Sequence, residues 1–164
     1  MRADEELLYF IALIPHITLR EEIRAVKERM KADYNAGHAL KSPAHITLQI
    51  PFKRSSTEEG RMTEALRRFA ATEKPFTVDL NGYGAFPPRV IFIKIVDPGP
   101  VQGVHSRLKK VLLEELHFQQ EEVMKSVQPH ITIATRDLTK AAFSEAWAEL
   151  GPAERGASSE AGSN

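Results

Sequence analysis

The tripeptide His-Ile-Thr occurs three times in this chain, beginning at His16, His45 and His130. Imidazole and hydroxyl groups can move protons and bind phosphate at neutral pH. Residues i and i+2 of a β-strand point to the same face of a sheet, so a His-x-Thr strand presents an imidazole beside a hydroxyl. Two such strands facing one another would form a small cavity with two His and two Thr and would need no metal.

The first copy stands in a different context from the other two. His16 follows Pro15 at the end of an apolar run, and Thr18 has the spacing of a helix N-cap. We therefore interpret His16 as part of a strand end and helix start. His45 and His130 each begin an apolar strand shortly after a proline. The alternative for these two is a surface histidine at a strand start, with threonine present for its β-propensity.

Two opposed imidazoles suit general acid–base catalysis. With an unperturbed pKa of about 6.5, one ring can be neutral and take a proton while the other is charged and gives one. The hydroxyls of Thr47 and Thr132 can donate hydrogen bonds to phosphoryl oxygens as charge builds on them. Opening a cyclic phosphodiester needs these parts: a base for water, an acid for the leaving alcohol and donors for the equatorial oxygens. The same residues also allow a non-catalytic pocket for a phosphorylated ligand.

Composition narrows the classes of function. Lys and Arg number 22 and so do Asp and Glu, which makes the formal net charge zero. Proteins that grip long nucleic acids are usually basic, so we expect a small anionic ligand. The chain has no cysteine, which excludes disulfides, thiolate nucleophiles and Cys-ligated metals. We expect no metal site, since no third ligand accompanies the two histidines. No export signal or membrane-spanning run is indicated, and we expect a cytoplasmic protein.

Apolar periodicity predicts alternating strands and helices. We expect strands at Leu7–Ile14 (buried), His45–Ile50, Phe76–Asn81, Val90–Val96 and His130–Thr135. We expect helices at 19–34, after Ser55 or Ser56, from Gly99 to about His117 and after 135, with a turn-rich loop at Gly82–Pro88. Both halves therefore repeat strand, helix, His-x-Thr strand, helix. A duplicated α+β unit would have two lobes, and a pseudo-twofold axis would bring the two motifs together in a central cleft between two antiparallel sheets.

The first half continues after its second helix into a further strand, and the second half lacks an equivalent of that strand. No counterpart of Phe76–Asn81 follows the fourth helix, because residues 151–164 are rich in Gly, Ala and Ser and show no apolar alternation. We expect a two-lobed domain over residues 1–150 and a flexible tail over 151–164. Either the second sheet is short of its last strand, or the chain has been altered after about Leu150.

The paired motifs resemble those of the 2H phosphoesterase superfamily, which includes 2′-5′ RNA ligase-like proteins and 2′,3′-cyclic nucleotide phosphodiesterases. The resemblance rests on His45-Ile-Thr-Leu48 and His130-Ile-Thr-Ile133, which begin 85 residues apart. The opening strand Phe10–Pro15 and the segment Phe76–Val96 support it, and it covers roughly residues 7–150. It implies a bilobal α+β fold with a central cleft, no metal or other cofactor, and a small nucleotide or RNA end as substrate.

Carried over to this sequence, the resemblance implies that His45 and His130 are the acid–base pair and that Thr47 and Thr132 bind the phosphate. It implies that His130 activates water and that His45 protonates the leaving 3′-oxygen, giving a 2′-phosphate. The activity would be hydrolysis of 2′,3′-cyclic phosphates. The alternative within the family is 2′-5′ RNA ligation, which is the reverse chemistry on the same residues.

Two further residues are candidates for substrate binding. Phe86, in the Gly/Pro-rich loop, could stack on a base or could be a plug of the core. Arg136 lies soon after the second motif, where relatives often place an arginine, and could contact phosphate or be a solvated side chain at a strand end. We expect the protein to be a monomer.

Overall fold

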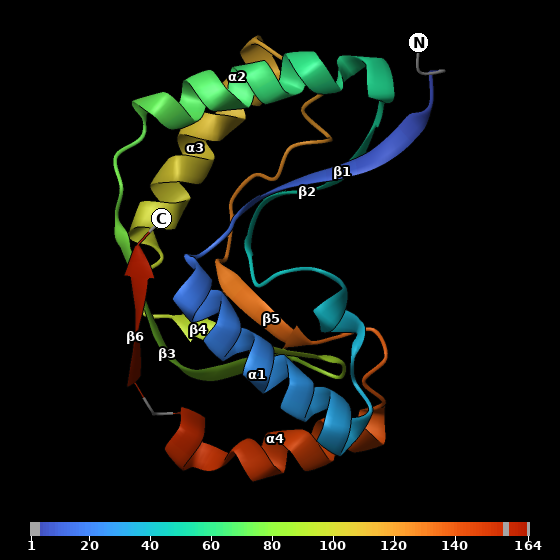
Figure 1. The fold of residues 1–164 in the computed structure, drawn as a ribbon, viewed down its shortest axis with the longest axis vertical. Coiled ribbons are helices and arrows are strands. Elements are labelled where there is room, and N and C mark those ends of the chain that lie inside the picture. Colours follow the sequence, from blue (N-terminus) through green and yellow to red (C-terminus); the bar gives the residue numbers. More distant parts are fainter. Residues whose placement is uncertain (1–3, 156–157, 164) are drawn as a thin grey trace. The chain divides into compact units, whose positions relative to one another are not determined.

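The computed structural model describes the backbone of residues 4–155 and 158–163, and the side chains up to Leu150. In chain order the elements are β1 (Glu6–Leu13), α1 (Ile17–Tyr34), the 3₁₀ helix η1 (His38–Lys41), β2 (Ile46–Ser55), the 3₁₀ helix η2 (Ser56–Glu58), α2 (Glu59–Thr72), β3 (Thr77–Phe86), β4 (Val90–Ile95), α3 (Gly99–Glu114), β5 (His130–Ala134), α4 (Lys140–Arg155) and β6 (Ser158–Ser163). Strands β1 and β2 form one sheet, and the other has the order β5-β4-β3-β6 (Figure 1). The predicted α+β class with two antiparallel sheets is confirmed.

The chain divides into two compact units that are not its two halves. The two-stranded unit comprises Met1–Ala12, Thr47–Pro75 and Pro98–Gln128, and the four-stranded unit comprises Leu13–Ile46, Phe76–Asp97 and Pro129–Asn164. Helix α1 of the first half therefore belongs with the sheet of the second half, and α3 of the second half belongs with β1 and β2. Each half of the repeat contributes to both units.

The core of the two-stranded unit lies between its sheet and helices α2 and α3. The Phe52 ring stacks on Tyr9 at 6.0 Å and meets Phe118 edge-on at 4.8 Å. Strand β1 was expected to be buried, but none of its residues is fully buried. Residues 6–10 alternate between exposed and partly buried, with Leu8 66% and Phe10 46% exposed, and residues 11–13 are partly buried. The unbroken apolar run concealed this alternation, because both faces of β1 carry apolar side chains.

Helix α1 begins two residues earlier than the sequence predicts. His16 is the N-cap residue, and its Nδ1 accepts a hydrogen bond from the Leu19 amide at 3.5 Å. The expected cap, Thr18, lies inside the first turn instead. His16 therefore belongs to the start of a helix, as its context indicated, and Leu19, Ile23 and Met30 form the buried face.

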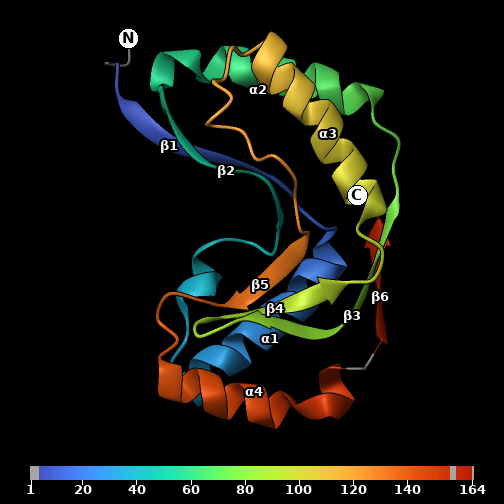
Figure 2. The same cartoon turned by 180° about the vertical axis from the view of Figure 1, so that it is seen from behind.

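In the four-stranded unit, α1 packs against β5 and α4 packs against β3 (Figure 2). Strand β3 continues through Gly82 and Gly84, where the sequence predicts a loop. The register shifts between Leu80 and Tyr83, and Gly82 has a φ of 69°. Glycine adopts this left-handed conformation without strain, so it marks a bulge within the strand rather than its end. The turn to β4 comes at Pro87–Pro88, where the Arg89 amide donates to the Phe86 carbonyl.

The last strand of the second repeat, its third, is present as β6. It pairs antiparallel with β3, with Leu80 opposite Ser159 and Asn81 opposite Ser158, after α4 has continued to Arg155. The expectation that the second sheet is short of its last strand is therefore corrected. An edge strand is held by main-chain hydrogen bonds, so a Gly/Ala/Ser sequence can form one without apolar alternation. Residues 156–157 and 164 of the predicted tail lie outside the described residues.

Candidate functional site

The two His-x-Thr motifs have the same pattern of burial. His45 directly precedes β2, and His130 is the first residue of β5. Both histidines, Thr47 and Thr132 are partly exposed. The alternate aliphatic residues are at most 4% exposed: Ile46, Leu48, Ile131 and Ile133. Each motif therefore turns its imidazole and hydroxyl to one side of the strand and its aliphatic side chains into a core.

The His130 ring lies against two phenylalanines. Its centroid is 5.1 Å from that of Phe86, with the rings nearly perpendicular at 84°, and 5.1 Å from that of Phe92. The two phenylalanine rings contact one another at 4.6 Å. Phe86 was predicted to bind substrate, and the structure brings it together with His130 while leaving it 36% exposed. These contacts restrict the orientation of the imidazole.

The position of the Phe92 ring depends on a glycine of the neighbouring strand. Gly84 pairs directly with Phe92, and a Cβ on Gly84 would lie 2.5 Å from two atoms of the Phe92 ring. The absence of a side chain thus lets the ring lie over β3 and reach His130. The sequence did not single out Phe92, and the signal that could have found it is Gly84, a glycine within a strand that leaves room for a large side chain on the neighbouring strand.

His45 is held by a loop rather than by a strand. Its Nδ1 lies 2.8 Å from the carbonyl oxygen of Pro43. Because a carbonyl oxygen can only accept, Nδ1 carries the proton of this hydrogen bond. Nε2 is therefore the nitrogen of His45 whose protonation can change between a base and an acid form.

Polar tethers fix the loop that leads to His45. The ammonium of Lys27, a residue only 2% exposed, donates to the carbonyl oxygens of Ala39 at 2.8 Å and Ser42 at 3.1 Å. Burial, and secondarily the positive charge of Arg24, lower the pKa of Lys27. The sequence places Lys27 on the apolar side of α1 but does not reveal these partners.

A second tether ties this loop to the turn after β5. The carboxylate of Asp137 accepts hydrogen bonds from the amides of Gly37 at 3.0 Å and His38 at 2.9 Å. Arg136, the other predicted substrate-binding residue, is exposed in the same turn and has a φ of 39°. Within the four-stranded unit, Asp137 thus connects the segment that carries His45 with the strand that carries His130.

The candidate residues do not all belong to one unit. His45, His130 and Thr132 lie in the four-stranded unit, whereas Thr47 is the first residue of β2 that belongs to the two-stranded unit. The division between the units therefore passes through the first motif, between Ile46 and Thr47.

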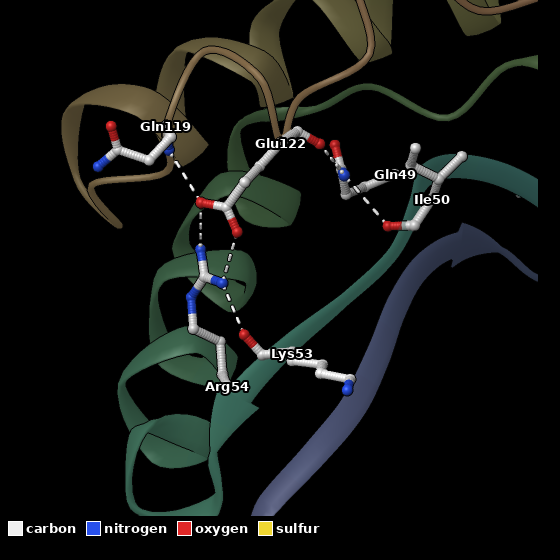
Figure 3. Close-up of polar contacts among 6 residues, drawn as sticks. All are labelled: Gln49, Ile50, Lys53, Arg54, Gln119 and Glu122. Atoms are coloured by element: carbon white, nitrogen blue, oxygen red, sulfur yellow. Dashed lines mark hydrogen bonds and ion pairs between the residues drawn. The ribbon is translucent and has the colours of Figure 1, made fainter.

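An ion pair at the far end of β2 organises the two-stranded unit (Figure 3). Arg54 donates to both carboxylate oxygens of Glu122, at 2.7 and 3.0 Å, and its guanidinium lies 4.2 Å from the centre of the Phe118 ring. The main-chain amide of Gln119 donates to the same carboxylate. The side-chain amide of the buried Gln49 donates to the main-chain carbonyl of Glu122 at 2.8 Å. The hydrogen bonds from Arg54 and then Gln119 lower the pKa of Glu122. This network anchors the loop that leads from α3 to β5.

In the part of the chain that the structure describes, no group of three or more His, Cys, Asp or Glu could hold a metal ion. Over the same residues, no helix has the length and apolar character needed to cross a membrane.

Comparison with known proteins extends the likeness beyond the motifs. The sequence model of the 2′-5′ RNA ligase superfamily matches residues 15–160. A protein of Oceanobacillus iheyensis named "Putative phosphoesterase" is 29% identical over 139 residues, which is 84% of this chain and 75% of that protein. A protein of the same name from Bacillus cereus is 27% identical over 128 residues, covering 75% of this chain and 66% of its own length.

A solved structure agrees at the level of the fold. The crystal structure of TT0787 of Thermus thermophilus superposes with a TM-score of 0.53 and 24% identity, over 94% of this chain and 80% of that one. Since the superfamily match covers most of the sequence, the chain belongs to the 2′-5′ RNA ligase superfamily. The resemblance to 2H phosphoesterases that the paired motifs predicted is thereby confirmed.

Proposed function

We propose that this chain is a metal-independent phosphodiesterase that opens 2′,3′-cyclic phosphates of RNA ends or nucleotides. The observation that carries the proposal is the matched pair of motifs in a member of this superfamily, each with a partly exposed His and Thr above buried aliphatic residues. Two histidines and two threonines supply the acid, the base and the hydrogen-bond donors that this reaction needs.

In the proposed reaction, neutral His130 takes a proton from water as the water oxygen bonds to phosphorus. The bond between phosphorus and the 3′-oxygen breaks, and charged His45 gives its Nε2 proton to that oxygen, leaving a 2′-phosphate and a 3′-hydroxyl. The hydroxyls of Thr47 and Thr132 donate to the non-bridging oxygens as their charge grows. The Pro43 carbonyl supports the role of His45, because it fixes which of its nitrogens exchanges the proton.

Phe86 and Arg136 give the proposal a component of substrate binding. Phe86 is partly exposed beside His130 and offers a ring on which a base could stack, while Arg136 is an exposed cation in the turn after β5. We propose that Phe86 contacts the base and that Arg136 contacts phosphate. A monomeric, cytoplasmic enzyme without a cofactor remains our expectation.

The decisive test is hydrolysis of 2′,3′-cyclic nucleotides by His45→Asn and His130→Asn variants. Each should lower kcat by about 10²–10⁴-fold, the usual contribution of a positioned acid or base. The wild-type rate should be unchanged by EDTA and should follow a bell-shaped pH profile. His117→Asn is the matched control, since His117 is exposed with a φ of 54°, a conformation that Asn tolerates. Wild-type turnover in both site variants would refute the proposal.

RNA 2′-5′ ligation is a second candidate, favoured by the name of the superfamily. Incubating RNA halves that carry a 2′,3′-cyclic phosphate and a 5′-hydroxyl separates the two reactions, because only ligation yields a joined product. A non-catalytic pocket is a third, and tight nucleotide binding without hydrolysis over hours would favour it. An incomplete second sheet would favour such a pocket, but its last strand is present as β6.

A further inference from the structure

A pocket of about 290 Å³ lies in the four-stranded unit, between one face of α1 and the loop that precedes His45. Arg20, Arg24 and Lys27 line it from successive turns of α1, and Lys41 lines it from η1. Ser42, Pro43 and Ala44 complete the wall on the loop side. The proposed reaction uses none of these side chains.

The lining of this pocket is strongly basic in a chain whose formal net charge is zero. Its lining includes four Lys or Arg residues and one carboxylate, Glu21. The ion pair of Arg24 with Glu28 spans 3.8 Å between side chains that are 65% and 50% exposed, so it neutralises little of this charge. An excess of cations in a concave site attracts anions, and the enclosing walls strengthen the attraction.

Arg20 supplies the most specific observation. Its Nε is buried and has no hydrogen-bond partner among the described residues. A buried donor without a partner costs about 1–3 kcal/mol, so native structures seldom keep one unless a ligand or water satisfies it. Guanidinium groups bind phosphate through two parallel hydrogen bonds, one of which can come from Nε.

Two further features suit an anion. The first turn of α1 contains no acidic residue, and Ile17 at its start lines the pocket, so the positive end of the helix dipole lies at one end of the pocket. Lys27 is already engaged with the Ala39 and Ser42 carbonyls and holds the wall in place. Arg20, Arg24 and Lys41 are therefore the side chains left to contact a ligand.

We propose that this pocket binds a phosphate group other than the one that reacts. The phosphate could be a second group on the substrate molecule or could belong to a separate small molecule, and the chemistry of recognition is the same. Pro43 joins the pocket to the first motif, because it lines the pocket and its carbonyl accepts from His45 Nδ1. Phosphate binding in the pocket should therefore affect the His45 ring.

Titration with inorganic phosphate, followed by amide NMR at constant ionic strength, tests the site without any need for turnover. In the wild type, the signals of Arg20, Lys41 and Ser42 should shift together and saturate. Arg20→Gln should weaken this binding by about tenfold or more, as expected for losing charge-assisted hydrogen bonds. Arg67→Gln is the control, because Arg67 is an exposed arginine of α2 that pairs with its helix neighbour Glu64 at 2.8 Å, and it should bind like the wild type.

The proposal would be overturned if the amides of Arg20, Lys41 and Ser42 showed no saturable shift, or if the shifts were confined to Thr132 and its neighbours. It would also be overturned if Arg20→Gln and Arg67→Gln lost binding equally. If Arg20→Gln melts well below the wild type, Lys41→Gln is read instead, with the same expectation. Cyclic nucleotides with and without a 5′-phosphate then distinguish the two sources. If the phosphate belongs to the substrate, Arg20→Gln should raise KM only for the nucleotide that carries a 5′-phosphate. If it belongs to a separate ligand, the change in KM should be the same for both nucleotides.

Discussion

The two His-x-Thr motifs are alike in sequence and burial but are supported in different ways. His130 and Thr132 lie in a regular strand, opposite Lys94 and Phe92 of β4, and the imidazole is flanked by two aromatic rings. His45 instead precedes its strand and is oriented by a carbonyl of its own loop. The comparison shows that the second motif is placed by sheet pairing and apolar packing, and the first by polar contacts of its loop.

This difference has a consequence for how each motif responds to change. The loop before His45 depends on Lys27 and Asp137, whose partners are main-chain groups far away in the sequence. The neighbours of His130 depend on Gly84, whose lack of a side chain leaves room for Phe92. A substitution at one support should therefore disturb one imidazole and leave the other unchanged.

The strongest test of the likeness between the motifs is Thr47→Val against Thr132→Val. Valine keeps the shape and strand preference of threonine and removes the hydroxyl, so the strands should persist. Each change should lower kcat on 2′,3′-cyclic nucleotides by about 10²–10³-fold, the usual loss for one donor to a developing oxyanion. Thr77→Val, at an exposed position of β3, is the matched control and should keep the wild-type rate. A full rate in either site variant would break the functional pairing of the motifs.

The next test concerns the ion pair that joins the strand of the first motif to the loop before the second. Glu122→Gln should lower the free energy of unfolding by about 1.5–3 kcal/mol, the range for charge-assisted hydrogen bonds. Because the pKa of Glu122 is lowered on folding, its contribution is present above the pKa of the unfolded carboxyl and is lost as pH falls through the folded value.

Urea unfolding at neutral and acidic pH measures this effect. The gap between wild type and Glu122→Gln should narrow as the pH falls below the unfolded pKa of Glu122. Glu64→Gln removes an exposed partner of Arg67 on α2 and should change stability little at any pH. A gap that stays constant down to acidic pH would show that the carboxylate charge contributes nothing.

The sequence predicted those parts of the site that follow from strand periodicity. Ile46, Leu48, Ile131 and Ile133 are buried because alternate residues of a strand share a face, and this also fixes where each His and Thr points. What periodicity could not predict are contacts between distant residues. Asp137 reaches the His38 amide across 99 positions, and nothing local to either residue indicates this contact.

Errors in the predicted fold have equally local causes. Gly82 and Gly84 were interpreted as a turn, but glycine serves both turns and bulges, and only the pairing of β3 with β4 distinguishes them. The N-cap at His16 was missed because histidine is not among the residues that usually cap helices. Strand β6 was missed because main-chain pairing alone leaves no pattern of side chains.

Gly84→Ala tests the apolar support of the second motif. The new methyl group would meet the Phe92 ring at 2.5 Å, so the ring must move away from its place beside His130. Overpacking of this kind costs about 1–3 kcal/mol of stability. The ring signals of His130 should shift in NMR spectra, while those of His45 should not. Gly60→Ala is the control, since a Cβ there meets no atom within 4 Å. Equal shifts at both histidines would show that the two supports are not separate.

The smallest effect is expected from ending the chain after Arg155, which removes β6. In the sheet order β5-β4-β3-β6, β6 and the strand that carries His130 lie at opposite edges, so the neighbours of His130 remain in place. We expect stability to fall by no more than about 1 kcal/mol, because the net gain of the main-chain hydrogen bonds of β6 is largely offset by the entropy cost of ordering an edge strand. In addition, no apolar alternation indicates that β6 adds to a core. Thermal melting and cyclic-nucleotide turnover measure the two quantities. A large loss of turnover would mean that the edge strand, despite its distance from β5 in the sheet, supports the second motif through β3 and β4, and the predicted domain boundary near residue 150 would then be wrong.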